Sequence, residues 1–247
     1  MMESDSLPNT SFPLPKSEFI GPKNAELTSL TIGQYFKRVV DNYTDHPAIV
    51  VRHQNINWTY KEYWLQIERV ACGLLANGVE PGDRVGIWSP NNIEWSIVQM
   101  ATARIGAIMV CLNPAYRPNE LAFAINNVQV KYLVMAQSFK QSNYVAMLKE
   151  LAPEIEDDRN DSLAQPLSLS MLPSLKFIYT IGDQPVDGLL PFSALQREPT
   201  ESLRIKLTEI EAELSADDNI NIQFTSGTTG NPKGATLTHR NILNNGL

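Results

Sequence analysis

The amino-acid sequence predicts an α/β fold in which a mostly parallel β-sheet carries helices on both of its faces. The first observation is an alternation, from residue 84 onward, of short apolar runs with helical segments of roughly 10–15 residues, the pattern of βαβ units. The second is the composition, since 43% of the 247 residues are hydrophobic, which is enough for a sizeable core. The third is that no run of about 18 apolar residues occurs, so no transmembrane segment is expected.

Two helix starts are indicated near the amino terminus. Thr31 is followed three residues later by Gln34, and Thr59 by Glu62, which is the spacing of a capping box. Apolar residues on one helical face follow each pair. The elements expected here are an irregular arm with four prolines (1–27), a helix from 31, a hairpin (48–51 and 56–58) around Asn55, and a helix from 59 that ends before Gly78.

The rest of the chain supplies the alternating elements. A turn at Pro81–Asp83 precedes the first of them, and an acidic stretch at 154–158 interrupts the pattern. Strands are expected at 84–88, 107–112, 131–135, 175–181 and 220–224, and helices from Asn91 or Asn92 to 104 and at 119–127, 144–151 and 201–214.

Charge and cysteine content exclude several classes of protein. Residues 150–218 hold 15 acids against 5 bases, which argues against a nucleic-acid surface, and Lys37-Arg38 is too short for a basic patch. Two cysteines in this length exclude a disulfide scaffold, so Cys72 and Cys111 are expected to be buried thiols. Neither has a histidine at metal-ligand spacing, so no zinc site is expected.

The amino-terminal segment shows no targeting signal. It lacks the basic start and apolar core of a secretory signal. It is acidic early, at Glu3 and Asp5, and has no arginine before Arg38, which disfavours a mitochondrial transit peptide. We therefore expect a cytoplasmic location.

One loop carries chemical information. The β-type run 220–224 leads into Thr225–Gly234, which holds three glycines, four hydroxyl residues, Pro232 and Lys233. Glycines let successive backbone N–H groups form an anion-binding nest, and hydroxyls add donors. An ammonium adds roughly 4 kcal/mol of attraction at about 4 Å and an effective dielectric constant near 20. A Walker loop is excluded, because the chain contains no Gly-Lys pair. The alternative is a surface turn without a ligand.

This loop resembles the phosphate-loop signature of the AMP-forming acyl-CoA synthetases, in the adenylate-forming superfamily. Three earlier segments resemble the same family in the same order. Within that family, Asn113–Arg117 and Gly234–Asn241 are most similar to medium-chain fatty acyl-CoA synthetases. The three segments are Trp58–Glu62, Gly78–Ile87 and Ala103–Arg117.

The resemblance implies that residues 28–247 are the N-terminal portion of the large, AMP-binding domain. It implies ATP-dependent activation of a medium- or long-chain fatty acid to an acyl-adenylate and then to acyl-CoA, with release of AMP and pyrophosphate. ATP, Mg²⁺ and coenzyme A are the implied ligands, and Thr225 is an implied Mg²⁺ ligand. The residues implied to hold the ATP phosphates are Thr225, Ser226, Gly227, Thr228, Thr229, Gly230, Asn231, Pro232 and Lys233.

The resemblance assigns no catalytic residue to this chain, because the family's adenine-binding segments, hinge and C-terminal lysine follow the phosphate loop. We therefore expect the chain alone not to ligate acyl-CoA. Two alternatives stay open: a truncated, non-catalytic nucleotide-binding or interaction fragment, and an enzyme that adenylates aryl or amino acids. His239 is expected to start a helix or pack in the core, and Asp217 and Asp218 to form a turn.

Overall fold

A computed structural model describes residues 26–157, 165–225 and 232–246. Its centre is a seven-stranded sheet in the order β11-β10-β4-β3-β5-β8-β9. Every neighbouring pair is parallel except β10 and β11, so the predicted α/β fold is confirmed. The strands are β3 (Arg84–Trp88), β4 (Ile108–Cys111), β5 (Tyr132–Ala136), β8 (Phe177–Ile181), β9 (Leu190–Pro191), β10 (Asn219–Thr225) and β11 (Lys233–Thr238).

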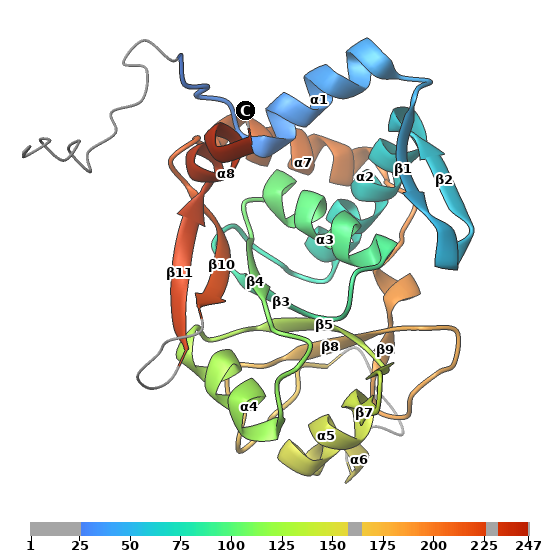
Figure 1. Ribbon diagram of the computed structural model, residues 1–247, viewed down its shortest axis with the longest axis vertical. Helices are drawn as coiled ribbons and strands as arrows, with labels where there is room; N and C mark the ends of the chain where they lie inside the picture. The colour runs from blue at the N-terminus through green and yellow to red at the C-terminus, as the bar shows by residue number, and fades with distance from the viewer. Residues whose placement is uncertain (1–25, 158–164, 226–231, 247) are drawn as a thin grey trace, which may run out of the picture.

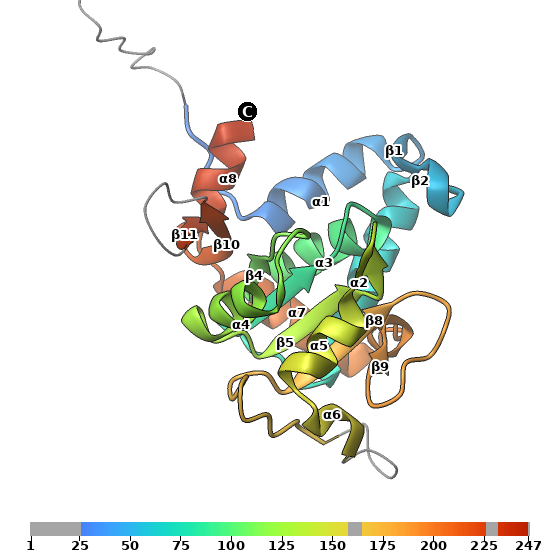
Figure 2. The ribbon, with the colours of Figure 1, turned by 60° about the horizontal axis from the view of Figure 1, so that its bottom comes forward.

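Helices cover both faces of the sheet, as Figures 1 and 2 show. The helices on one face are α2 (Tyr60–Ala76), α3 (Ile93–Arg104) and α7 (Glu201–Glu213). Helix α1 (Ile32–Tyr43) packs outside α2 and α3. On the other face lie α4 (Pro118–Asn127), α5 (Tyr144–Leu151) and the short α6 (Glu154–Asp157).

The central strand β5 shows why both faces are apolar. Leu133 and Met135 belong to the core cluster beneath α4 and α5, whereas Tyr132 and Val134 belong to the cluster beneath α2 and α3. Successive side chains of a strand point to opposite faces. A strand covered on both sides is therefore apolar throughout, which is why the sequence shows a continuous apolar run here.

Local signals placed the amino-terminal elements correctly. The Thr31 hydroxyl accepts from the Gln34 N–H at 3.2 Å, and Thr59 and Glu62 form the second capping box. The expected hairpin is β1 (Pro47–Val51) and β2 (Ile56–Thr59), joined by the short 3-10 turn η1 (Arg52–Gln54) and a left-handed Asn55 with φ of 53°. Asn92 caps α3 by accepting from the Trp95 N–H at 2.8 Å.

Some elements differ from expectation. The strand expected from 175 begins only at Phe177, because the Leu175 N–H donates to the Leu172 carbonyl in a turn. The strand β11 was not predicted. Further short elements are β6 (Ser138–Phe139), β7 (Ser142–Asn143), η2 (Phe192–Leu195) and a helix α8 (His239–Gly246). Within the described ranges, no helix is long and apolar enough to cross a membrane.

Helix α8 holds the segment that leads into α1. The Ile32 N–H donates to Nδ1 of the buried His239 at 3.1 Å. The Thr28 N–H donates to the Asn244 side-chain oxygen at 2.8 Å, and the Asn244 amide returns a bond to the Thr28 carbonyl at 3.1 Å. The expectation that His239 starts a helix and packs in the core is confirmed.

Candidate functional site

The topology opens a crevice at the carboxyl edge of the sheet, between β3 and β4. The chain leaves β3 for α3 on one face, and leaves the neighbouring β4 for α4 on the other face. Two adjacent loops that diverge to opposite faces leave a crevice between them, which is the usual ligand site of open α/β sheets.

Side chains from three strands and their loops line this crevice, whose volume is about 330 Å³. Strand β10 contributes because it pairs in parallel with β4, with Gln223 opposite Cys111. The polar groups come chiefly from the two diverging loops. The lining residues are Ser89, Asn91, Trp95, Cys111, Leu112, Asn113, Pro114, Gln223 and Phe224.

Two buried aromatic residues fix the loop after β4. Trp88 stacks on Tyr144 with ring centroids 3.7 Å apart and planes 10° from parallel. The Trp88 indole N–H donates to the Asn113 carbonyl at 3.2 Å, and the Tyr144 hydroxyl donates to the Pro114 carbonyl at 2.5 Å. Burial raises the pKa of Tyr144 to about 12, so the phenol remains a donor near neutral pH.

Neither cysteine is activated by its surroundings. Cys72 is fully buried in α2, as expected, and burial raises the pKa of its thiol. Cys111 is only half-buried, in contrast to the expectation, because it ends β4 at the crevice. Burial raises the pKa of Cys111 as well, and its sulfur lies 3.5 Å from the amide nitrogen of Asn221. A protonated thiol is a poor nucleophile.

The predicted phosphate loop leaves the sheet at this same edge. Thr225 ends β10 and Lys233 begins β11, and the two are paired residues of the antiparallel ladder. Both are exposed, and the Thr225 hydroxyl donates to the Lys233 carbonyl at a long 3.4 Å. Ser226, Gly227, Thr228, Thr229, Gly230 and Asn231 lie outside the described residues. Lys233 and Gly234 belong to a strand rather than to the loop itself, because they pair with Thr225 and Phe224.

The acidic pair before β10 is structural, as expected. Asp217 forms an ion pair with Arg240 at 2.6 Å, and the Asp218 carboxylate accepts from the Ser215 N–H at 2.8 Å. The described ranges contain no group of three or more His, Cys, Asp or Glu residues placed to hold a metal ion.

The crevice residues Ser89, Asn91 and Asn113 were not singled out as site residues from the sequence. The available signal was their position, since each lies within three residues of the end of a strand of a βαβ unit. Trp95 lines the crevice and is only half-buried, whereas Trp88 and Tyr116 are buried in the core.

A model of the family described as AMP-binding enzyme matches residues 36–247. The chain belongs to this family. The resemblance drawn from the ordered motifs is thereby confirmed, since the phosphate-loop signature and all three earlier segments fall within the match.

Medium-chain acyl-CoA ligases named ACSF2, mitochondrial, are similar to this chain. The Danio rerio protein is 40% identical over 91% of this chain and 36% of its own length, and the Mus musculus protein is 37% identical over 99% and 40%. The chain thus spans well under half the length of these relatives.

Solved structures share the fold. Acetoacetyl-CoA synthetase from Streptomyces lividans has a TM-score of 0.69 at 22% identity, over 88% of this chain and 31% of its own. The N-terminal domain of FACL13 from Mycobacterium tuberculosis has a TM-score of 0.60 at 21% identity, over 85% and 44%. Both likenesses concern the fold alone, and they agree with an N-terminal portion of a larger domain.

The expected cytoplasmic location is wrong, because the ACSF2 relatives are named as mitochondrial. The expectation used only the charge composition of residues 1–26. The composition of a short arm carries little information about an address that a receptor reads.

Proposed function

We propose that this protein takes part in the ATP-dependent activation of a medium-chain fatty acid to acyl-CoA, with release of AMP and pyrophosphate, in mitochondria. Residues 28–247 would form the N-terminal portion of its AMP-binding domain and supply the loop that binds the ATP phosphates. The substrate class and the location follow the names of the ACSF2 relatives.

The observation that carries the proposal is the position of Thr225 and Lys233. Both are exposed where β10 ends, and β10 pairs with β4, whose own end lines the crevice. A nucleotide with its base and sugar near the crevice would therefore have its phosphates within reach of the loop. The proposal therefore has the phosphates bound by the loop and the rest of the nucleotide bound in the crevice, at one edge of the sheet.

The chemistry needs charge stabilisation more than covalent help. The substrate carboxylate attacks the α-phosphorus of ATP, the bond to the bridging oxygen breaks, and pyrophosphate leaves with the negative charge. Lys233 and the backbone N–H groups of Thr225–Lys233 would hold the β- and γ-phosphates. They would thus stabilise the leaving group as its charge grows.

Thr225 fits a minor role toward Mg²⁺, which accompanies ATP and neutralises phosphate charge when bound. Its hydroxyl is exposed, and its bond to the Lys233 carbonyl is long at 3.4 Å, so an oxygen lone pair is free to bind the ion. A Mg²⁺ ion bound mainly by phosphates and water needs only one or two protein oxygens. Coenzyme A would accept the acyl group in the second step.

The test is acid-dependent exchange of labelled pyrophosphate into ATP by the whole protein. With octanoate, Lys233→Ala should lower the exchange rate by about 100-fold, the effect of removing one charge-stabilising group. The matched control Lys206→Ala removes an exposed lysine from α7 and should exchange like the wild type.

Several outcomes would reject the proposal. A folded, ATP-binding protein that gives no exchange with any fatty acid would do so. Exchange with an aromatic or amino acid instead of a fatty acid would show that the protein is an enzyme that adenylates aryl or amino acids. Acyl-CoA formation by residues 1–247 alone would contradict the view that the chain supplies only one part of the site.

A further inference from the structure

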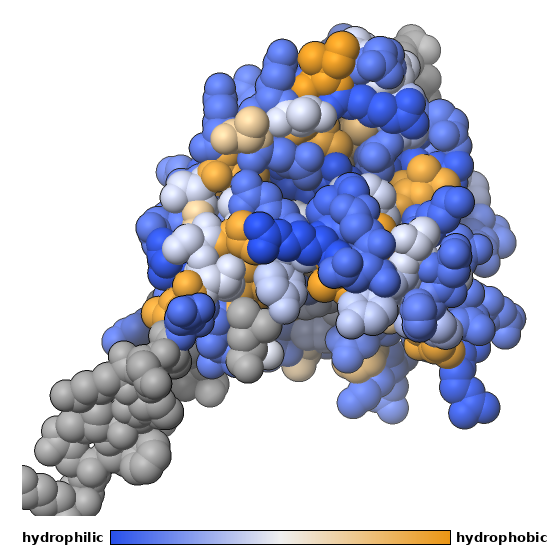
Figure 3. Space-filling model, turned by 90° about the horizontal axis from the view of Figure 1, so that it is seen from above, coloured by the Kyte–Doolittle hydropathy of each residue, from blue (hydrophilic) through white to orange (hydrophobic). Residues whose placement is uncertain are grey.

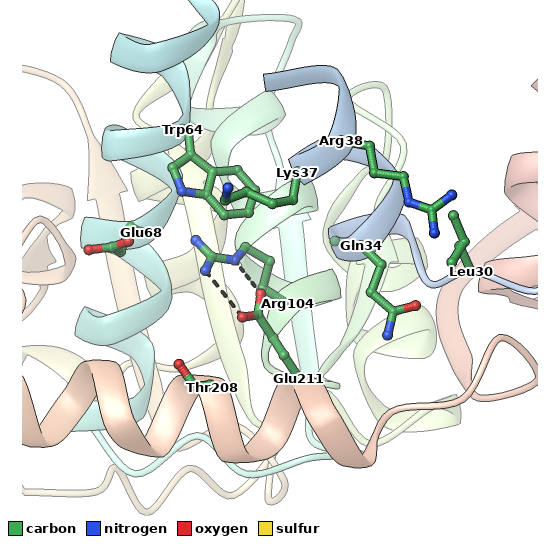
Figure 4. Close-up of a pocket in the computed structure, with 10 residues that line it drawn as sticks. Leu30, Gln34, Lys37, Arg38, Trp64, Glu68, Arg104, Thr208 and Glu211 are labelled. Carbon is green, nitrogen blue, oxygen red and sulfur yellow. Dashed lines mark hydrogen bonds and ion pairs between the residues drawn. The ribbon is translucent and has the colours of Figure 1, made fainter. Parts of the chain in front are cut away.

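A second, larger pocket lies away from the crevice, among α1, α2, α7 and the carboxyl end of α3 (Figure 4). Its volume is about 600 Å³, which lies in the range of sites for small organic ligands. The crevice lies at the other end of α3, about 16 Å away along the helix axis at about 1.5 Å per residue. The proposed function uses none of the residues of this pocket.

Arg104 forms the floor of the pocket and is incompletely bonded. Its side chain is only 5% exposed, its Nε donates to Glu211 Oε1 at 2.6 Å, and its Cζ lies 3.9 Å from the Trp64 ring centroid. Figure 4 shows the guanidinium between these two side chains. The remaining nitrogen, Nη1, is buried and has no hydrogen-bond partner among the described residues. A buried guanidinium nitrogen without an acceptor is unfavourable, so a small shift of the surrounding side chains that opened Nη1 to the pocket would let it donate to a ligand oxygen.

The charge balance of the pocket favours an anion. Both acids of the wall are already paired: Glu211 binds Arg104, and Glu68 accepts from Arg204 at 3.0 Å. The rim adds Lys37 and Arg38 from α1, both exposed.

The rim cations are free to turn toward a ligand. Among the residues that the structure describes, Lys37 pairs only with the exposed Asp41 of its own helix, an arrangement that is weak in water. In Figure 4 Lys37 projects from α1 on the side of the pocket where Trp64 lies.

The surrounding surface also favours a charged ligand over an apolar one. Seen from the side of α1 and α8, the surface is mainly hydrophilic, and its hydrophobic areas are small and separate (Figure 3). At the floor, Gly33 lets α1 approach the Arg104–Glu211 pair closely, since a Cβ there would lie 3.3 Å from Arg104 Cγ. The helix that carries the rim cations therefore packs closely against the buried pair, although in Figure 4 the Arg38 side chain points away from Arg104, toward Leu30.

We propose that this pocket binds an organic oxyanion. Its carboxylate or phosphate head would accept from Arg104 Nη1 and from Lys37 and Arg38, and its organic body would fill the remaining volume. This is a ligand site separate from the crevice, so its occupancy does not depend on the chemistry proposed there.

The test follows tryptophan indole N–H signals by NMR in ¹⁵N-labelled protein, with octanoate as the carboxylate probe and inorganic phosphate as the phosphate probe. Trp64 reports on the pocket and Trp95 on the crevice. The Trp64 signal should shift in a saturable way with at least one probe. The double variant Lys37→Gln/Arg38→Gln should weaken that binding by about tenfold, whereas Lys140→Gln, an exposed lysine near α5 on the other face, should leave it unchanged.

Arg104→Lys supplies the second variant, because it keeps the charge and loses Nη1. With the fold verified by circular dichroism, it should weaken the Trp64 response at least as much as the double variant does. A response to octanoate alone identifies a carboxylate head, and a response to phosphate alone identifies a phosphate head. Shifts confined to Trp95, no shift with either probe, or equal affinity in the wild type and both variants would overturn the proposal.

Discussion

Protonation of His239 should destabilise the fold as the pH falls. The imidazole is fully buried, and its Nδ1 accepts the Ile32 N–H at 3.1 Å. Burial lowers the pKa of His239 from 6.5 to about 4, although the nearby Asp218 opposes the shift. The unfolded chain therefore binds the proton first, and the stabilisation from neutral His239 is complete above pH 6.5 and is lost as the pH falls toward 4.

The size of the effect follows from the two pKa values. They differ by about 2.5 units, and each unit corresponds to about 1.36 kcal/mol, so about 3 kcal/mol of unfolding free energy should be lost between pH 7 and pH 4. The matched variant is His239→Asn, whose side-chain oxygen can accept the same Ile32 N–H but does not titrate in this range.

The assay is urea unfolding of both proteins at pH 7, 6, 5 and 4. As the pH falls, the unfolding free energy of the wild type should decrease relative to that of His239→Asn by up to about 1.4 kcal/mol per pH unit. Asp218 is present in both proteins, so its own titration largely cancels. Parallel stability curves across this range would refute the reasoning.

Three substitutions should lower stability through different mechanisms. Gly73→Ala should cost about 3 kcal/mol in thermal unfolding, because a Cβ there would overlap the Leu195 carbonyl. Trp88→Phe should cost at least about 1 kcal/mol in urea unfolding, since it leaves the Asn113 carbonyl without its indole donor. Thr59→Ala should cost about 1 kcal/mol, because it removes the hydroxyl that caps α2.

Each of these has a matched comparison. A Cβ at Gly82 meets nothing within 4 Å, so Gly82→Ala should carry only the strain of its positive φ, about 1–2 kcal/mol. Equal losses at Gly73 and Gly82 would show that overlap is not the cause. Trp58→Phe makes the same ring change in the half-buried β2, and Thr59→Ser, which retains a capping hydroxyl, should restore most of the stability lost in Thr59→Ala.

The features that could be read from the sequence depend on neighbours along the chain. The capping pair Thr31 and Gln34 lies within one helical turn, and the apolar run of β5 reflects burial on both faces, so each is a local pattern. The strand β11 was missed because Lys233–Thr238 contains glycine, alanine and threonines in place of a clear apolar alternation, and its pairing with β10 supplies what the pattern lacks.

For the same reason, only one half of the candidate site could be predicted from the sequence. The loop Thr225–Lys233 could be recognised from its residue types alone. The crevice beside it requires β10 to pair with β4, a contact between segments about 110 residues apart, and no local pattern specifies such pairing. The pocket at Arg104 likewise depends on Glu211, which α7 brings back from 107 residues further along the chain.

The contact between Ile32 and His239 has a consequence for biosynthesis. The two residues are 207 positions apart, and ribosomes add about 5–20 residues per second, so α1 emerges roughly 10–40 s before its partner exists. The α1 terminus is uncovered during that interval, and for about its second half so is the edge of β4 that β10 later covers. Nascent chains are therefore expected to need chaperone protection until α8 has left the ribosome.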